Sequence, residues 1–299
     1  MQKTFDIPRR VLTEEELLQP GVLSCQGCGA SLAMKLALKG LGRRTVVVIP
    51  ACCWTIIVGV YPYSALQVPM VHVPFETAAV VASGIRASLD VRGEKDAVVM
   101  AWAGDGGTFD IGLQALSGAA ERNDDILYVC YDNEAYMNTG IQRSSATPVG
   151  AWTTTTPSGA IKQEPKKNME KILLGHGIPY IATASVAYPD DVFRKFEKAR
   201  HIRGTRFIHL LSPCPPGWRI DSHESIRVTR MATLANVFPV YEITNGQYTI
   251  NVTPEKKLPV QEYLRSQGRF RLMSEEMIRS VQESVDRNWE ALIRQSTTT

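Results

Sequence analysis

Short apolar runs recur along the first 211 residues of the chain, each separated from the next by a polar or amphipathic stretch. The runs are apolar along most of their length and do not alternate with polar residues. This pattern is typical of parallel strands that are buried on both faces of a sheet. The predicted strands span residues 45–50, 97–103, 126–130, 178–183 and 207–211.

Helical patterns fill the stretches between these runs. In residues 109–120, the apolar side chains recur at helical spacing and share one face. A helix that joins two parallel strands forms a right-handed crossover. We therefore predict an α/β fold with a doubly wound parallel sheet, helices on both faces and a domain boundary near residue 220. The predicted helices span residues 31–41, 78–89, 109–120 and 190–203.

The pattern changes after residue 220. We predict a helix over residues 227–237, a hairpin whose strands 240–244 and 248–252 flank Asn245-Gly246-Gln247, and an amphipathic helix over 274–294. The predicted parts of the chain are an N-terminal arm (1–24), the α/β domain (25–220) and a C-terminal extension (221–299) that packs on the domain or on a partner subunit.

Four segments have weaker patterns. We expect a short acidic helix over residues 14–18 and a loop over the sheet edge from Pro62 to Pro74. Residues 142–161 are polar without a hydrophobic period, so they form either a lid over a functional site or a solvated surface loop. Residues 162–171 predict a basic helix with a solvated face.

Composition narrows the class of protein. The chain has 299 residues, 44% of them hydrophobic, which is enough for one large core or two smaller ones. A formal charge of +3 without a long basic run gives no indication of nucleic-acid binding. Residues 1–12 lack the apolar region of a signal peptide, and Pro50 divides the longest apolar stretch. We therefore expect a cytoplasmic protein without a membrane span.

Candidate chemistry begins where the strand 97–103 ends. Gly104-Asp105-Gly106-Gly107 follows this strand directly and precedes a helix. Glycines leave backbone N–H groups accessible, and the start of a helix favours negative charge. A diphosphate group fits this turn, although a purely structural tight turn produces the same residues.

Asn133 follows the next predicted strand, 126–130, and lies 28 residues after Asp105. The carboxyl ends of parallel strands lie on the same edge of a sheet, where such folds bind ligands. Mg²⁺ prefers oxygen ligands and commonly joins a carboxylate and an amide or carbonyl to the phosphates of a ligand. Asp105 and Asn133 supply that set of donors.

Six cysteines in a chain without a secretory signal favour metal or redox chemistry over disulfides. Successive side chains of an extended chain diverge, so only one residue of the Cys52-Cys53 pair can join a shared site. Four thiolates suit either tetrahedral zinc or a 4Fe–4S cluster, and their spacing does not separate the two. The candidates are Cys25 and Cys28 in CQGCG, Cys52 or Cys53 after the first strand, and Cys214 after the last, whereas Cys130 is expected to pack in the core.

Two motifs carry a resemblance to a known family. The GDG sequence, followed by about thirty residues and an Asn, resembles the thiamine diphosphate motif, and DNEAYMNTG at residues 132–140 resembles the beta subunit of the 2-oxoacid:ferredoxin oxidoreductases. SPCPPGWR and FPVYEITNG extend the resemblance over nearly the whole chain. It implies a thiamine diphosphate-binding fold.

The resemblance also implies roles for residues at the sheet edge. Asp105, the side chain of Asn133 and the backbone carbonyl of Ala135 would bind Mg²⁺, and Asn138 and Thr139 would lie near the reacting thiazolium ring. The implied contacts with the cofactor come from Gly104, Asp105, Gly106, Gly107, Asn133, Ala135, Tyr136, Asn138 and Cys53.

For the cysteines, the resemblance favours iron-sulfur over zinc. Cys53-Trp54-Thr55-Ile56 matches the family pattern of a cysteine with isoleucine three residues later, which favours Cys53 over Cys52. The implied ligands of a 4Fe–4S cluster are Cys25, Cys28, Cys53 and Cys214. No further ferredoxin-like cysteine motif is present, so electrons would pass to another subunit.

The implied activity is oxidative decarboxylation of a 2-oxoacid with coenzyme A as acyl acceptor and ferredoxin as electron acceptor. The implied partners are an alpha subunit that completes the thiamine site and gamma and ferredoxin-like delta subunits. Pyruvate is the preferred substrate, with branched-chain 2-oxoacids or oxalate as alternatives. A non-redox thiamine decarboxylase or transketolase half, or a zinc-stabilised scaffold subunit, would each explain only one of the two sites.

Overall fold

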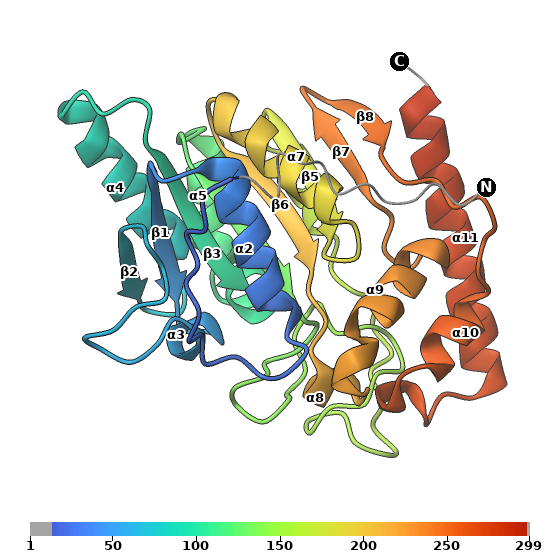
Figure 1. Ribbon diagram of the computed structural model, residues 1–299. Helices are drawn as coiled ribbons and strands as arrows, with labels where there is room; N and C mark the ends of the chain where they lie inside the picture. Colours follow the sequence, from blue (N-terminus) through green and yellow to red (C-terminus); the bar gives the residue numbers. More distant parts are fainter. Residues whose placement is uncertain (1–13, 298–299) are drawn as a thin grey trace.

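The computed structural model describes residues 14–297 and contains one eight-stranded sheet (Figure 1). The strand order is β2-β1-β3-β4-β6-β5-β7-β8. All neighbouring strands from β2 to β5 pair in parallel, which confirms the predicted α/β class. The strands are β1 (Thr45–Pro50), β2 (Met70–Val73), β3 (Val98–Gly104), β4 (Leu127–Asp132), β5 (Tyr180–Ser185), β6 (Arg206–Leu211), β7 (Tyr241–Thr244) and β8 (Gln247–Ile250).

Helices cover both faces of the sheet, as predicted. One apolar core lies between the sheet and α2 and α7, and a second lies on the face covered by α4, α5 and α6. Cys130 is fully buried in the second core, which confirms its packing role. The helices of this part are α2 (Gly29–Leu41), α3 (Trp54–Ile57), α4 (Ala78–Val91), the π-helical turn η1 (Gly106–Asp110), α5 (Leu113–Glu121), α6 (Met169–Leu174), α7 (Pro189–His201) and α8 (Pro215–Trp218).

The C-terminal segment continues the same sheet. The predicted hairpin is present as β7 and β8, and β7 pairs antiparallel with β5. The last helix runs beside β8 at one end of the molecule (Figure 1). A third core joins the helices of this segment to Trp218, whereas the hairpin contributes Ile243 to the second core. The division of the chain at residue 220 stays a prediction. The helices here are η2 (Ser222–Glu224), α9 (Ser225–Leu234), α10 (Val260–Arg265), η3 (Gly268–Phe270) and α11 (Glu275–Thr297).

The predicted loop from Pro62 to Pro74 is wrong in one part, because it contains β2. Val47 pairs with Met70 and Pro50 with Val73 in parallel register. As an edge strand, β2 has no fully buried residue and needs no long apolar run. Prolines immediately before and after it hid a four-residue strand from the hydrophobic pattern.

Of the two short helices predicted from charge, one is absent and the other begins later than predicted. Residues 14–18 form no helix; Leu18 instead bridges to Leu66, and Glu16 pairs with Lys35 and Lys39. Residues 1–13 of the predicted arm lie outside the described residues. The basic helix starts only at Met169, because Asn168 caps it by accepting a hydrogen bond from the Lys171 N–H at 2.8 Å.

The segment before α6 is not a solvated face. Lys162 is buried and donates to the carbonyl oxygens of Thr147 (2.6 Å) and Glu164 (2.7 Å). Residues 142–161 are irregular, as predicted, but Ser144 and Thr153 within them are buried. This loop therefore packs against the edge of the sheet and is not simply solvated.

No helix within residues 14–297 has the length and apolar character that a membrane span requires.

Candidate active site

The candidate site lies where the carboxyl ends of β1, β3 and β4 meet. Because β3 pairs with both β1 and β4, the segments that follow these strands enclose one cavity of about 230 Å³. Every residue for which the sequence implied a cofactor contact lines it. The lining residues are Ala51, Cys52, Cys53, Phe75, Gly104, Asp105, Gly106, Gly107, Tyr131, Asn133, Ala135, Tyr136, Met137, Asn138 and Thr139.

Three oxygen donors converge in this cavity. One terminal atom of the Asn133 amide lies 3.1 Å from Asp105 Oδ1 and 2.9 Å from the Ala135 carbonyl oxygen. If this atom is nitrogen, it donates to both oxygens; if it is oxygen, three oxygens face one another without a proton between them. Octahedral ligands at roughly 2.0–2.1 Å from Mg²⁺ lie about 2.9 Å from one another. Both distances from the amide atom therefore agree with the spacing of neighbouring magnesium ligands, once the amide presents its oxygen.

Asp105 is a buried carboxylate that lacks a full counter-charge. It is 1% exposed, and its Oδ2 accepts a hydrogen bond from the Ser144 hydroxyl. Burial raises the pKa of Asp105 well above its usual range, and repulsion from Asp132 adds to the shift. A bound cation would stabilise the ionised form of this carboxylate.

The glycine turn begins as a π-helical turn and leaves no space for larger side chains. A Cβ on Gly106 would lie 2.1 Å from the Tyr136 ring. Tyr136 in turn donates to Asp110 Oδ2 at 2.7 Å, so its ring is held over the turn. The absence of a side chain at Gly106 therefore permits the close approach of the two segments that line the cavity.

The cysteine segments come from three separate places in the chain and also lie close together. Cys25 and Cys28 close a turn in which the Cys28 N–H donates to the Cys25 carbonyl (3.1 Å). The next amide, of Gly29, donates to the Pro213 carbonyl (3.0 Å), which brings this turn against the segment of Cys214. A Cβ on Gly29 would lie 2.2 Å from Pro213 Cδ, so only glycine permits this contact.

Cys53 lies between the cysteine segments and the cavity. Its thiol donates to Asn138 Oδ1 at 3.1 Å. Burial raises the pKa of the Cys53 thiol to about 12, with repulsion from Cys52, Cys214 and Cys28 adding to the effect. Burial likewise raises the pKa of Cys214 to about 11, with repulsion from Cys28 and Cys25.

Cys52 faces a different neighbourhood. Its Cβ lies beside Gly104, next to the hydroxyl of Tyr131, and burial is the main cause that raises the pKa of its thiol. This arrangement favours Cys53 as the member of the pair that joins Cys25, Cys28 and Cys214.

The sulfur atoms do not converge on a single point. Within residues 14–297, no three His, Cys, Asp or Glu side chains form a group that could hold one metal ion.

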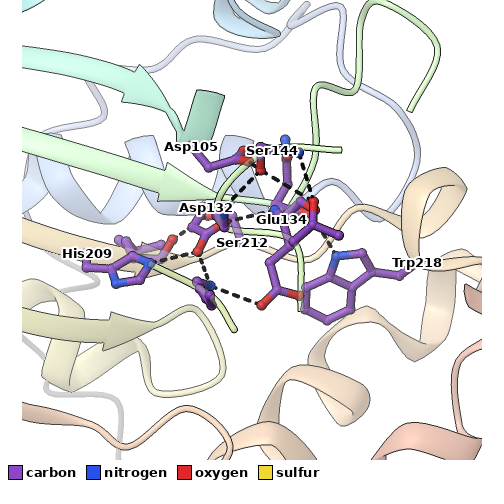
Figure 2. A network of polar contacts seen from close by, with 12 residues as sticks. Asp105, Asp132, Glu134, Ser144, His209, Ser212 and Trp218 are labelled. Atoms are coloured by element: carbon purple, nitrogen blue, oxygen red, sulfur yellow. Dashed lines mark hydrogen bonds and ion pairs between the residues drawn. The ribbon is translucent and has the colours of Figure 1, made fainter. Parts of the chain in front are cut away.

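A buried polar network supports the 132–135 turn from below (Figure 2). Asp132 accepts hydrogen bonds from Lys166 and from His209 Nε2 (2.7 Å), and His209 Nδ1 contacts Glu170 on its other side. Lys166 also reaches Glu134 Oε1 at 3.1 Å. Lys166 stands in the segment for which the sequence predicted a solvated face, and that prediction is wrong.

Sequence reasoning missed Ser144, His209, Trp218 and Arg269. Ser144 lay in a segment without periodicity, and His209 stood inside an apolar strand. Trp218 was part of SPCPPGWR, but no pattern indicated its partner. Its indole N–H donates to the Asn133 carbonyl at 2.9 Å, a contact 85 residues apart in the chain.

Comparison with known families agrees with this geometry. Residues 53–210 match the family model described as thiamine pyrophosphate enzyme, C-terminal TPP binding domain. This match covers more than half of the chain. The fold and the site thus define a thiamine diphosphate enzyme domain.

Relatives that match over nearly their whole length show which family of thiamine diphosphate enzymes this is. The chain is 51% identical to ketoisovalerate oxidoreductase subunit VorB of Pyrococcus abyssi, over 98% of this chain and 97% of the relative. It is 49% identical to pyruvate synthase subunit PorB of Methanothermobacter marburgensis, over 92% and 96%. The chain therefore belongs to the family of 2-oxoacid:ferredoxin oxidoreductase beta subunits, whose enzymes require partner subunits.

A solved structure shares the fold. It is 2-oxoglutarate:ferredoxin oxidoreductase from Magnetococcus marinus with 2-oxoglutarate, coenzyme A and succinyl-CoA bound, which matches with a TM-score of 0.57 at 23% identity. The match covers 70% of this chain and 77% of that chain. At this identity the likeness concerns the fold alone.

Proposed function

We propose that this chain holds both thiamine diphosphate with Mg²⁺ and a 4Fe–4S cluster, in an enzyme that oxidatively decarboxylates a 2-oxoacid. The observation that carries the proposal is the position of Cys53. It lines the cavity of Asp105 and Asn133 and lies near Cys28 and Cys214, whose thiolates would oppose the ionisation of its thiol. A non-redox thiamine enzyme has no use for these cysteines, and a zinc scaffold has no use for the three oxygens.

In this proposal Asp105, the Asn133 side chain and the Ala135 carbonyl hold Mg²⁺. The metal would stabilise the ionised form of the buried Asp105, whose pKa is raised by burial and by Asp132. Gly106 and Gly107 line the adjoining part of the cavity and suit the diphosphate, because they expose backbone without side chains.

Cys25, Cys28, Cys53 and Cys214 hold the cluster. Thiols bind iron only as thiolates, so binding of the cluster would release protons from Cys53 and Cys214, whose pKa values are raised by burial. Cys53 and Asn138 are in direct contact, so the two sites share a wall. Electrons that leave the thiamine site would enter the cluster without crossing another subunit.

Thiamine diphosphate, when bound, supplies the electron sink for decarboxylation, and the cluster accepts the electrons one at a time. The chain's own residues would bind and orient the ligands: Asn138 and Thr139 line the cavity, and Asn138 contacts Cys53. No glutamate of the described residues lines the cavity. We therefore expect the alpha subunit to supply the glutamate that activates the cofactor, and the isolated chain to be inactive.

Pyruvate remains the proposed substrate. Ketoisovalerate is the second candidate, because the ketoisovalerate oxidoreductase subunit VorB is 51% identical to this chain. Among the described residues that line the cavity there is no lysine or arginine. The walls that this chain contributes through Phe75, Tyr136 and Met137 suit an apolar 2-oxoacid tail, and we expect the alpha subunit to supply most of the residues that select the acid.

The test is dye reduction by the holoenzyme purified anaerobically with its partner subunits. With coenzyme A present, pyruvate should support viologen reduction with the highest kcat/KM, ketoisovalerate next, and 2-oxoglutarate weakly. A higher kcat/KM with ketoisovalerate would replace the first candidate by the second. No reduction with any 2-oxoacid would contradict the proposed function.

A further inference from the structure

One buried tryptophan touches both the oxygen site and the cysteine site. Trp218 is fully buried at the end of the short helix α8. Its backbone N–H donates to the carbonyl of Cys214 at 2.8 Å, while its indole N–H donates to the carbonyl of Asn133 at 2.9 Å. The residue thus connects the segment of Cys214 with the turn of Asn133, and Figure 2 shows Trp218 beside the polar network of that turn.

Arg269 holds the other side of this tryptophan. Its guanidinium lies 4.2 Å from the centre of the Trp218 ring, and its Nη2 donates to Glu134 Oε2 at 2.6 Å. Arg269 is 2% exposed, and its Nε donates to Gln267 Oε1 at 2.9 Å. A planar, fully charged guanidinium suits simultaneous stacking and pairing in a buried place.

The turn that these residues hold is conformationally unusual. Glu134 has φ of +69°, in the left-handed region that a residue with a side chain adopts rarely. Its N–H donates to Asp132 Oδ1 at 2.8 Å, and its carbonyl accepts from Thr147 Oγ1 at 2.7 Å. Such a conformation persists only when surrounding contacts determine it.

These contacts leave one carbonyl facing the cavity. Trp218 engages the carbonyl of Asn133 and Thr147 engages that of Glu134, so the next carbonyl, of Ala135, is the one beside the Asn133 amide. Rotation of either preceding peptide would move this oxygen away from Asp105.

We propose that Trp218 and Arg269 are positioning residues that set the geometry of the Asn133 and Ala135 oxygens for the cation. The inference rests on the proposed function, because it assumes that these oxygens bind Mg²⁺. Neither residue lines the cavity, so both act through the 133–135 turn.

The experiment replaces Trp218 by phenylalanine, which keeps a ring and removes the indole N–H. Trp102→Phe is the matched control, because the indole N–H of Trp102 is equally buried and has no hydrogen-bond partner. Holoenzyme depleted of thiamine diphosphate and Mg²⁺ is titrated with Mn²⁺ in the presence of thiamine diphosphate. Electron paramagnetic resonance reports both the affinity and the line shape of bound Mn²⁺.

Loss of one buried hydrogen bond predicts that Trp218→Phe weakens Mn²⁺ binding by about tenfold and changes its line shape. Trp102→Phe should leave both unchanged, and iron content should be equal in all three proteins. Wild-type affinity and line shape in Trp218→Phe would overturn the inference, because a merely packing residue moves neither. If the wild type itself bound no Mn²⁺ with thiamine diphosphate, the proposed function would fail as well.

Arg269→Lys is the second variant, in case Trp218→Phe does not assemble. It keeps the charge beside Glu134 but loses the planar stack on Trp218. We expect Mn²⁺ binding weakened by about three- to tenfold with unchanged iron content. Unchanged Mn²⁺ affinity in this variant would also contradict the positioning role.

Discussion

The oxygen site and the cysteine site differ in how the chain builds them. Asp105 and Asn133 follow adjacent parallel strands whose register fixes their separation, and a buried network holds their turn from below. Cys25, Cys28 and Cys214 come from a turn and a proline-rich segment that meet through one backbone hydrogen bond, Gly29 to Pro213. Cys25 is exposed, whereas Asp105 is buried.

The sheet therefore preorganises the oxygen site, whereas the cysteine site depends on contacts between distant segments. We therefore expect the oxygen site to tolerate loss of iron, and the cysteine site to lose iron after small changes in backbone packing. Four changes test this contrast in order of expected effect.

Asp105→Ala should have the largest effect. Removing the only carboxylate of the oxygen set is expected to weaken Mg²⁺-dependent binding of thiamine diphosphate by at least roughly 100-fold. Titration calorimetry on the holoenzyme measures this, with iron content as the internal check. Asp96→Ala, an exposed carboxylate at the start of the segment before β3, is the control. Unchanged affinity in Asp105→Ala would exclude the magnesium assignment.

Gly29→Ala should break the cysteine site selectively. The added Cβ would lie 2.2 Å from Pro213 Cδ, so the turn of Cys28 must move away from the segment of Cys214. Such overpacking typically costs about 1–3 kcal/mol. We expect iron per chain to fall while thiamine diphosphate affinity stays within about twofold.

Gly84→Ala is the matched control for this change. Gly84 lies in α4, and a Cβ there meets no atom within 4 Å. Full iron content in Gly29→Ala would contradict the contrast between the two sites.

The network below the oxygen site predicts a pH dependence of stability. Burial alone lowers the pKa of His209, but Glu170 and Asp132 outweigh it and raise the pKa to about 9 from 6.5. A raised pKa in the folded state stabilises the protein fully below pH 6.5, and this contribution is lost as pH rises through 9. The raised pKa of His209 contributes up to about 3 kcal/mol to the free energy of unfolding.

Thermal unfolding from pH 6 to 10 measures this contribution. The midpoint temperature of the wild type should decrease as the pH rises from 6.5 to 9. The midpoint temperature of His209→Gln should be lower at pH 6.5 and should decrease less over the same interval. Equal slopes in the two proteins would show that the charge on His209 does not stabilise the network.

Cys52→Ala should have the smallest effect. Cys52 lies beside Gly104 and is not expected to bind iron, so iron content should stay unchanged and stability should fall by about 1 kcal/mol. Cys53→Ala, in contrast, should lose iron. The reverse result would exchange the two cysteines in the cluster.

The same contrast explains what the sequence could predict. Asp105 and Asn133 were predictable because buried strands have a strong local pattern and their carboxyl ends share an edge. The alternation of strands and helices, the C-terminal hairpin and the last helix followed from the same kind of signal. The β2 strand was missed because an edge strand of four residues needs no buried run.

The supporting contacts could not be predicted, because they join segments far apart in the chain. Arg269 pairs with Glu134 across 135 residues, and nothing in either local pattern indicates the other. The residues around Lys166 in the sequence are typical of a solvated lysine, yet Lys166 forms ion pairs with Asp132 and Glu134. Tertiary contacts of this kind become visible only when the fold is known.

The most direct test of the central claim is to measure iron and acid-labile sulfide per chain in anaerobically purified holoenzyme and in this subunit after separation from its partners. A visible spectrum of each sample is recorded before and after dithionite. The account predicts about four irons and four sulfides in the separated subunit, with a broad band that bleaches on reduction. One zinc per chain with no colour would contradict it.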